Sequence, residues 1–149
     1  MATAQDISDV TALLGRTPQG RFEVVVRDQE GHPVVVRNDP ILDDGTPMPT
    51  RFWLVGADAY RAVSRLEAQG GVRQAEAAID PDSITRAHMF AATERDAAIP
   101  SDHHGPRPSG GVAGTRNGVK CLHAHYAAFL VDGVDPVGAW VAERLGDYS

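Results

Sequence analysis

Two valine-rich runs separated by a short polar turn constrain the fold more than any other feature. Residues 22–27 and 33–37 have the composition of β-strands, and Asp28-Gln29-Glu30-Gly31 between them predicts a hairpin loop. Consecutive valines, in place of strict alternation with polar residues, indicate strands covered on both faces. Residues 51–55 form a third apolar run. The sequence therefore predicts a small antiparallel sheet of about three strands.

Most of the remaining chain has helical patterning. Asp6, Asp80-Pro81 and Asp135-Pro136 are residue types that cap or begin helices. We predict helices over residues 6–14, 57–69, 72–79, 80–98, 119–131 and 136–145. A chain of 149 residues is long enough to bury a core. We expect a single α+β domain over residues 1–149, in which four to six helices cover the sheet.

Two segments are too rich in proline and glycine to form regular elements. Residues 38–50 contain three prolines, and residues 99–114 contain three prolines and four glycines. We predict that residues 99–114 form a mobile surface loop.

The overall composition limits the class of partner and the compartment. A net charge of −6 argues against a general nucleic-acid-binding protein, which needs a basic face. The single cysteine excludes an intramolecular disulfide and fits a reducing compartment. Residues 1–9 lack the pattern of a signal peptide, and no apolar run approaches the roughly 18–20 residues of a membrane span. We therefore expect a cytoplasmic protein that binds neither membranes nor nucleic acids in general.

Residues 110–126 bring together flexible backbone, positive charge and titratable side chains. Glycines lead through Arg116 and Lys120 into a predicted helix that starts near Val119. Backbone amides and cations at a helix start favour an anion. The spacing is not that of a Walker loop, because cysteine follows Lys120. We predict a binding or regulatory protein with a phosphate-type pocket there, lined by Arg16, His88, Gly114, Arg116, Lys120 and His123.

An enzyme is the alternative function for the same stretch. A hydrolase or transferase acting on a phosphorylated substrate would use Cys121, His123 or His125 as its catalytic residues. The positive helix start would lower the pKa of the Cys121 thiol. Free cysteine is also common as a small, half-buried apolar residue, so this alternative stays open.

Metal binding and protein docking are two further hypotheses. On a helical wheel, Cys121 and His125 share one shoulder, while His123 falls on the opposite one. Cys121 and His125 are therefore the candidate metal ligands, and zinc would need further ligands from elsewhere. We expect no cofactor, with a transition metal at this pair as the alternative. An adaptor would instead dock on a protein partner through Trp53 or Trp140.

Several short motifs occur in order along nearly the whole chain. They are Leu14-Gly15-Arg16-Thr17-Pro18-Gln19-Gly20, Asp44-Gly45-Thr46-Pro47-Met48-Pro49-Thr50, Arg65-Leu66-Glu67, Arg86-Ala87-His88, Glu94-Arg95-Asp96, Val119-Lys120-Cys121-Leu122-His123-Ala124-His125 and Asp135-Pro136-Val137-Gly138. Together they resemble the bacterial domain-of-unknown-function family 501.

The resemblance implies a small uncharacterised bacterial protein, mainly actinobacterial. It agrees with a small anionic ligand such as polyphosphate, or with a regulatory protein partner. Members of the family commonly carry two further cysteines, at places where this chain has Asp28 and Gly56. If the family used three cysteines for one site, this chain keeps only Cys121.

Overall fold

The sheet has the size and direction predicted from the valine-rich runs. In a computed structural model, which describes residues 2–146, β1 (Phe22–Arg27), β2 (Pro33–Asn38) and β3 (Phe52–Leu54) pair antiparallel in the order β1-β2-β3. Val34, Val35 and Val36 of the central strand are at most 3% exposed. The prediction that both valine-rich strands are covered on both faces is therefore confirmed for β2 and wrong for β1, in which only Phe22 is buried.

One face of the sheet packs against α1 (Ala4–Leu14), where Val10 belongs to a buried apolar cluster with Val36 and Phe22. The prediction that Asp6 caps this helix is wrong. Thr3 is the N-cap, and its hydroxyl accepts a hydrogen bond from the Asp6 amide while the Asp6 carboxylate accepts one from the Thr3 amide. This reciprocal capping box places the N-cap three residues earlier than expected.

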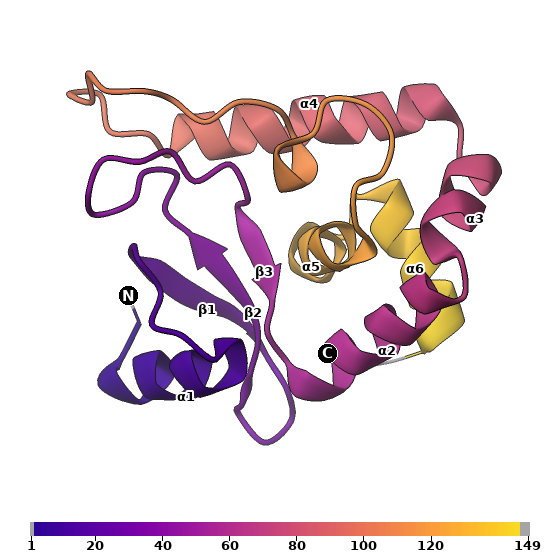
Figure 1. The fold of residues 1–149 in the computed structure, drawn as a ribbon, viewed down its shortest axis with the longest axis horizontal. Coiled ribbons are helices and arrows are strands. Elements are labelled where there is room, and N and C mark those ends of the chain that lie inside the picture. Colours follow the sequence, from indigo (N-terminus) through magenta and orange to yellow (C-terminus); the bar gives the residue numbers. More distant parts are fainter. Residues whose placement is uncertain (1, 147–149) are drawn as a thin grey trace.

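On the other face of the sheet, the remaining helices form the larger core, in which the helix over Leu122–Asp132 packs most extensively against the strands. These helices are α2 (Ala57–Ala68), α3 (Gly71–Ala78), α4 (Pro81–Ala97), α5 (Leu122–Asp132) and α6 (Pro136–Leu145). Figure 1 shows α5 nearly end-on between the sheet and α6, with α4 running across the top. Leu122, Tyr126 and Ala127 bury one side of α5 in this core. The single α+β domain predicted from the sequence is confirmed.

The start of α5 differs from its prediction. The helix begins at Leu122 and not near Val119, because Cys121 has extended backbone angles of φ −149° and ψ 152° and acts as the N-cap. The chain before it turns sharply, with Gly118 at φ 63°. A short 3₁₀ turn, η1 (Val112–Gly114), was also not predicted, since it contains Ala113 at the unusual φ of 54°.

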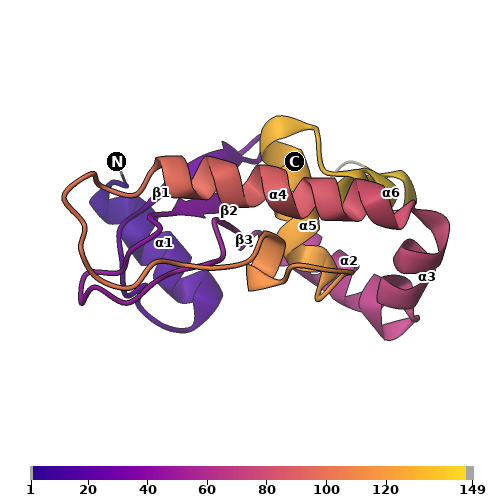
Figure 2. The ribbon, with the colours of Figure 1, turned by 90° about the horizontal axis from the view of Figure 1, so that it is seen from above.

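The proline-rich segment after α4, residues 99–114, is held by hydrogen bonds near its C-terminal end. Arg95 is 2% exposed and donates hydrogen bonds to the carbonyls of Gly110 and Pro49, at 2.9 and 3.1 Å. Val112 is buried, and its turn η1 lies alongside α4, as Figure 2 shows. The mobility of residues 99–114 stays a prediction. Within residues 2–146, no helix is long and apolar enough to cross a membrane.

Candidate functional site

The helix α5 faces three different environments. His123 turns toward α2, Ala124 and Ala128 line a cavity below α4, and His125 is buried against the start of α6. The stretch singled out from the sequence is therefore central to the fold. Its candidate residues do not share one site.

At the start of α5, an internal carboxylate takes the place predicted for an anionic ligand. The Leu122 amide donates a hydrogen bond of 2.7 Å to Glu67 Oε2, from the last turn of α2. His123 Nδ1 lies 3.4 Å from the same oxygen, and His123 Nε2 lies 3.1 Å from the Ser64 hydroxyl. Cys121, Glu67 and His123 bring three ligand-type atoms within 4.8 Å of one another. This polar group, named the α2–α5 cluster here, consists of Ser64, Glu67, Cys121 and His123.

The residues predicted to line the anion pocket are dispersed. Arg16 lies over the ring of Trp53, 5.5 Å from its centroid, next to the α1 side of the sheet. Gly114 packs against Pro49. Arg116 and Lys120 are exposed and have no hydrogen bond or ion pair among residues 2–146. The structure therefore groups only His123 with the start of α5, and the phosphate-type pocket stays a prediction.

His88, another predicted wall of that pocket, belongs to the core. Its Nδ1 accepts a hydrogen bond of 3.1 Å from the Val112 amide, so its Nε2 carries the proton and donates to the Gly118 carbonyl at 2.7 Å. Burial lowers the pKa of this imidazole, and the neighbouring His125 lowers it further. His88 is therefore a neutral ring that uses both nitrogens to fix the loop before α5.

His125 forms a buried pair with Asp135. Its Nδ1 donates to Asp135 Oδ2 at 2.8 Å, while Asp135 Oδ1 accepts from the amides of Val137 and Gly138 at the start of α6. His125 is completely buried, and its Nε2 has no hydrogen-bond partner within residues 2–146. This pair joins α5 to α6 and separates His125 from Cys121, its predicted partner.

The surroundings of Cys121 oppose its predicted role as an activated nucleophile. Burial raises the pKa of the thiol, and the Glu67 carboxylate raises it further. The amides of Ala124 and His123 at the start of α5 lower the pKa, but burial has the largest effect and the net shift is upward. In the metal-free protein, a smaller fraction of this thiol is therefore ionised than in an ordinary cysteine at the same pH.

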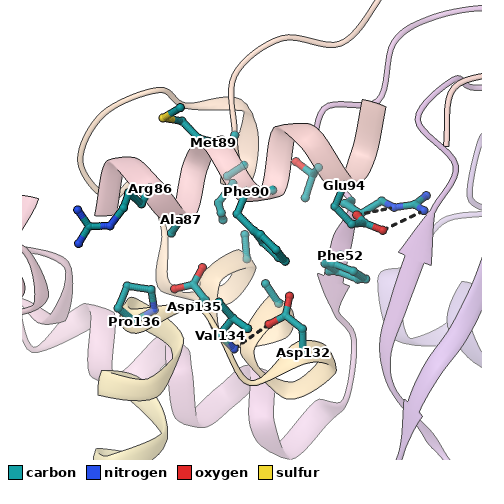
Figure 3. A pocket seen from close by; sticks show the side chains of 18 of the residues that line it. Phe52, Arg86, Ala87, Met89, Phe90, Glu94, Asp132, Val134, Asp135 and Pro136 are labelled. Carbon is teal, nitrogen blue, oxygen red and sulfur yellow. Dashed lines mark hydrogen bonds and ion pairs between the residues drawn. The ribbon is translucent and has the colours of Figure 1, made fainter. Parts of the chain in front are cut away.

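A second, apolar site lies on the opposite side of α5. A cavity of about 540 Å³ opens between α4, α5, η1 and the edge of the sheet. Its apolar lining includes Phe52, Ala87, Phe90, Ala91, Val112, Ala124 and Ala128. Figure 3 shows Phe90 directed from α4 toward α5, with Asp132 reaching toward it from the end of α5. A cavity of this size accommodates a small molecule.

The rim of the cavity carries charge. Glu94 is paired with Arg51 at 3.1 Å, and Asp135 is held by His125. The exposed Asp132 has no ion pair among the described residues and uses Oδ1 to accept from the Val134 amide. Arg86 lies toward the other end and, within residues 2–146, donates a hydrogen bond only to the Ser83 hydroxyl. Asp132 is thus the carboxylate available to a ligand.

The exposed apolar surface also differs from the prediction. Trp140 is 7% exposed, with the Arg144 guanidinium 3.7 Å from its ring centroid, and Trp53 is partly covered. Met89, Phe90 and Val134, which are 65%, 50% and 58% exposed, lie at the cavity instead. The most exposed of the large apolar side chains in the described chain, Met89 and Val134, therefore lie next to α4 and not at the two tryptophans.

Comparison with known proteins places the chain in a family. Residues 24–143 match the model of a family described as a protein of unknown function, DUF501. The chain belongs to the DUF501 family. No curated protein and no solved structure matches it. Membership therefore confirms the resemblance seen in the motifs, and it carries no activity with it.

Sequence reasoning missed the residues that complete both sites. Glu67 and Ser64 lie three apart on α2, a spacing that places both on one helix face, but nothing local connects them to α5. For the cavity, the sequence held one weak indication. Met89 and Phe90 are two adjacent large apolar residues close to the small Ala87 and Ala91. Only the packing of α4 over α5 turns that pattern into a site.

Proposed function

We propose that this DUF501 protein binds a small amphipathic molecule, with an apolar body and a cationic head group, in the cavity between α4 and α5. The observation that carries the proposal is the open cavity of about 540 Å³, whose lining is mainly apolar and combines alanine, phenylalanine and valine with methionine and proline. Ligand pockets of roughly 300–1,000 Å³ with a few polar groups are typical of proteins that bind small molecules.

The apolar lining supports a hydrocarbon or aromatic body for the ligand. Phe90 is half exposed and Val134 is 58% exposed, so both still present apolar surface to water. Covering this surface gains about 25 cal/mol per Å². Small side chains at Ala87, Ala91 and Ala128 leave the space that such a body fills.

The rim supports a cationic head group. Glu94 and Arg51 neutralise each other, while Asp132 has no cationic partner in the described chain. Asp135 also lines the wall, but His125 and the amides at the start of α6 already occupy its carboxylate. The overall charge of −6 also attracts a cation more than an anion. Arg86 is the one feature of the rim that favours an anion, so the test includes one.

Two probes with the same body and opposite charge test the proposal. We expect calorimetry to show that n-octylammonium binds and that n-octanoate binds more weakly. Affinity should rise about threefold to fourfold for each methylene added from butyl to octyl, since each buried methylene contributes about 0.8 kcal/mol. Inorganic phosphate and polyphosphate, the ligands predicted for the start of α5, serve as comparison ligands.

Paired variants locate the binding. Ala91→Leu fills part of the cavity and should weaken n-octylammonium binding by about tenfold, whereas Ala97→Leu, at an exposed position of the same helix, should leave it unchanged. Asp132→Asn should weaken it by up to about fivefold, the contribution of an exposed ion pair. Equal binding by Ala91→Leu and wild type, or tighter binding of octanoate, would contradict the proposal.

A further inference from the structure

Three metal-ligating side chains of different chemistry meet at the α2–α5 cluster. Glu67 comes from the last turn of α2, Cys121 is the N-cap of α5, and His123 lies in its first turn. One ligand atom of each lies within 4.8 Å of the others. Glu67 and His123 keep 27% and 17% of their side chains exposed, and Cys121 is partly buried. A dissolved ion can therefore reach the cluster.

The spacing is close to that of a tetrahedral site. From zinc bond lengths of about 2.0–2.3 Å, nitrogen and oxygen ligands lie about 3.3 Å apart, and sulfur lies about 3.6 Å from either. Glu67 Oε2 and His123 Nδ1 are 3.4 Å apart. All three ligand atoms lie within 4.8 Å of one another. Side-chain rotations that move these atoms by about 1 Å therefore bring them to the distances of a zinc site.

The atoms around the cluster orient its ligands. Ser64 Oγ lies 3.1 Å from His123 Nε2, so an Nε2–H group can donate to it and leave the Nδ1 lone pair for a metal. The Leu122 amide holds Glu67 by Oε2, and Oε1 has no hydrogen bond in the described chain. The Tyr60 ring lies 4.5 Å from the His123 ring and covers it on one side. Such outer contacts are typical of metal ligands.

We propose that Glu67, Cys121 and His123 form a zinc site whose fourth ligand is water. A sulfur, a nitrogen and an oxygen suit zinc and not calcium or magnesium, which take oxygen ligands. On binding, the sulfur–metal bond replaces the thiol S–H bond, and the proton goes to solvent. The thiolate and the carboxylate then balance the two charges of the ion. Three protein ligands and one water are the arrangement of an open zinc site.

Titration of the metal-free protein with zinc and with cobalt tests the site. We expect calorimetry to show one zinc per chain. Cobalt should give a thiolate-to-metal charge-transfer band and the visible absorption of a tetrahedral centre. Neither signal depends on an enzymatic activity or on the α4–α5 cavity, so the two proposals can fail separately.

Variants identify the ligands. Cys121→Ser keeps a residue type that caps helices well and should remove the charge-transfer band. His123→Ala should weaken zinc binding by at least about 100-fold, and Ser64→Ala, which removes only the orienting hydroxyl, by about 10-fold to 100-fold. His104→Ala, an exposed histidine in the loop after α4, should bind zinc as the wild type does. Circular dichroism without metal shows that each variant folds.

Absence of a charge-transfer band in the wild type would overturn the proposal. Equal zinc affinity of Cys121→Ser, His123→Ala and wild type would overturn it as well, since the ion would then lie elsewhere.

Discussion

The two sides of α5 differ in how completely their polar groups are paired with other groups of the protein. On the α4 side, Ala124 and Ala128 leave an apolar cavity with an unmatched carboxylate at its rim. On the α2 side, His123 and the first helix amide already contact Glu67. Small side chains on α5 thus create a site by leaving space, whereas polar side chains create one by converging. The same helix does both, and His125 between them holds α6.

The largest expected effect separates two aspartates that lie three residues apart. Asp135 is buried with His125, so Asp135→Ala removes a helix cap and leaves a buried imidazole unpaired. We expect a loss of about 3 kcal/mol or more in the free energy of unfolding. Asp132→Ala removes an exposed carboxylate that accepts one amide hydrogen bond, and should cost about 1 kcal/mol or less.

Urea unfolding monitored by circular dichroism measures both losses. Equal losses would mean that Asp132 is as structural as Asp135. In that case the cavity rim would have no carboxylate free for a ligand, and the contrast between the two residues would fail.

The next effect concerns pH. Burial holds the pKa of His88 below its ordinary value of 6.5, so the unfolded chain binds that proton first as the pH falls. The stability contributed by the neutral ring is complete above pH 6.5 and is lost on acidification toward the folded pKa. The slope for one such group is at most about 1.4 kcal/mol per pH unit. His125 lowers this pKa, and Asp135 raises it.

His88→Gln isolates this contribution. Glutamine can accept from the Val112 amide and donate to the Gly118 carbonyl, but it does not titrate. We expect the variant to lose less stability than the wild type between pH 6.5 and 5, measured by urea unfolding at each pH. Identical slopes for the two proteins would show that His88 is protonated in the fold, which would contradict its assigned hydrogen bonds.

The smallest effect is on the reactivity of Cys121. Because burial and Glu67 raise the pKa of its thiol, the metal-free protein should react with iodoacetamide more slowly than glutathione does at pH 7.5. Glu67→Gln removes one of the two causes and should increase the rate. A wild-type rate above that of glutathione would favour the alternative in which Cys121 is an activated nucleophile.

The sequence predicted the fold well where the pattern was local. Valine runs located the strands, and Asp80-Pro81 and Asp135-Pro136 located the starts of α4 and α6. It failed at the start of α5, because extended backbone at Cys121 takes that residue off the helical wheel. The assignment of Cys121 and His125 to one shoulder depended on that wheel.

The sites were less predictable than the fold, since each one depends on contacts distant in sequence. Glu67 and Leu122 are 55 residues apart, and His88 meets Gly118 across 30. The cavity depends on where α4 crosses α5, which no short pattern specifies. His123 stays a predicted site residue, and the residues that its ring contacts, Ser64 and Glu67, lie on α2.

The most direct test of two separate sites on one helix is a nuclear magnetic resonance titration of the labelled protein with n-octylammonium and then with zinc. We predict that n-octylammonium shifts the amide signals of Ala91, Ala124 and Ala128, while zinc shifts those of Glu67, Cys121 and His123. Each ligand should leave the other set nearly unchanged. If both ligands shifted the same set, or if n-octylammonium left the cavity signals in place, the account of α5 as a helix with two distinct sites would be contradicted.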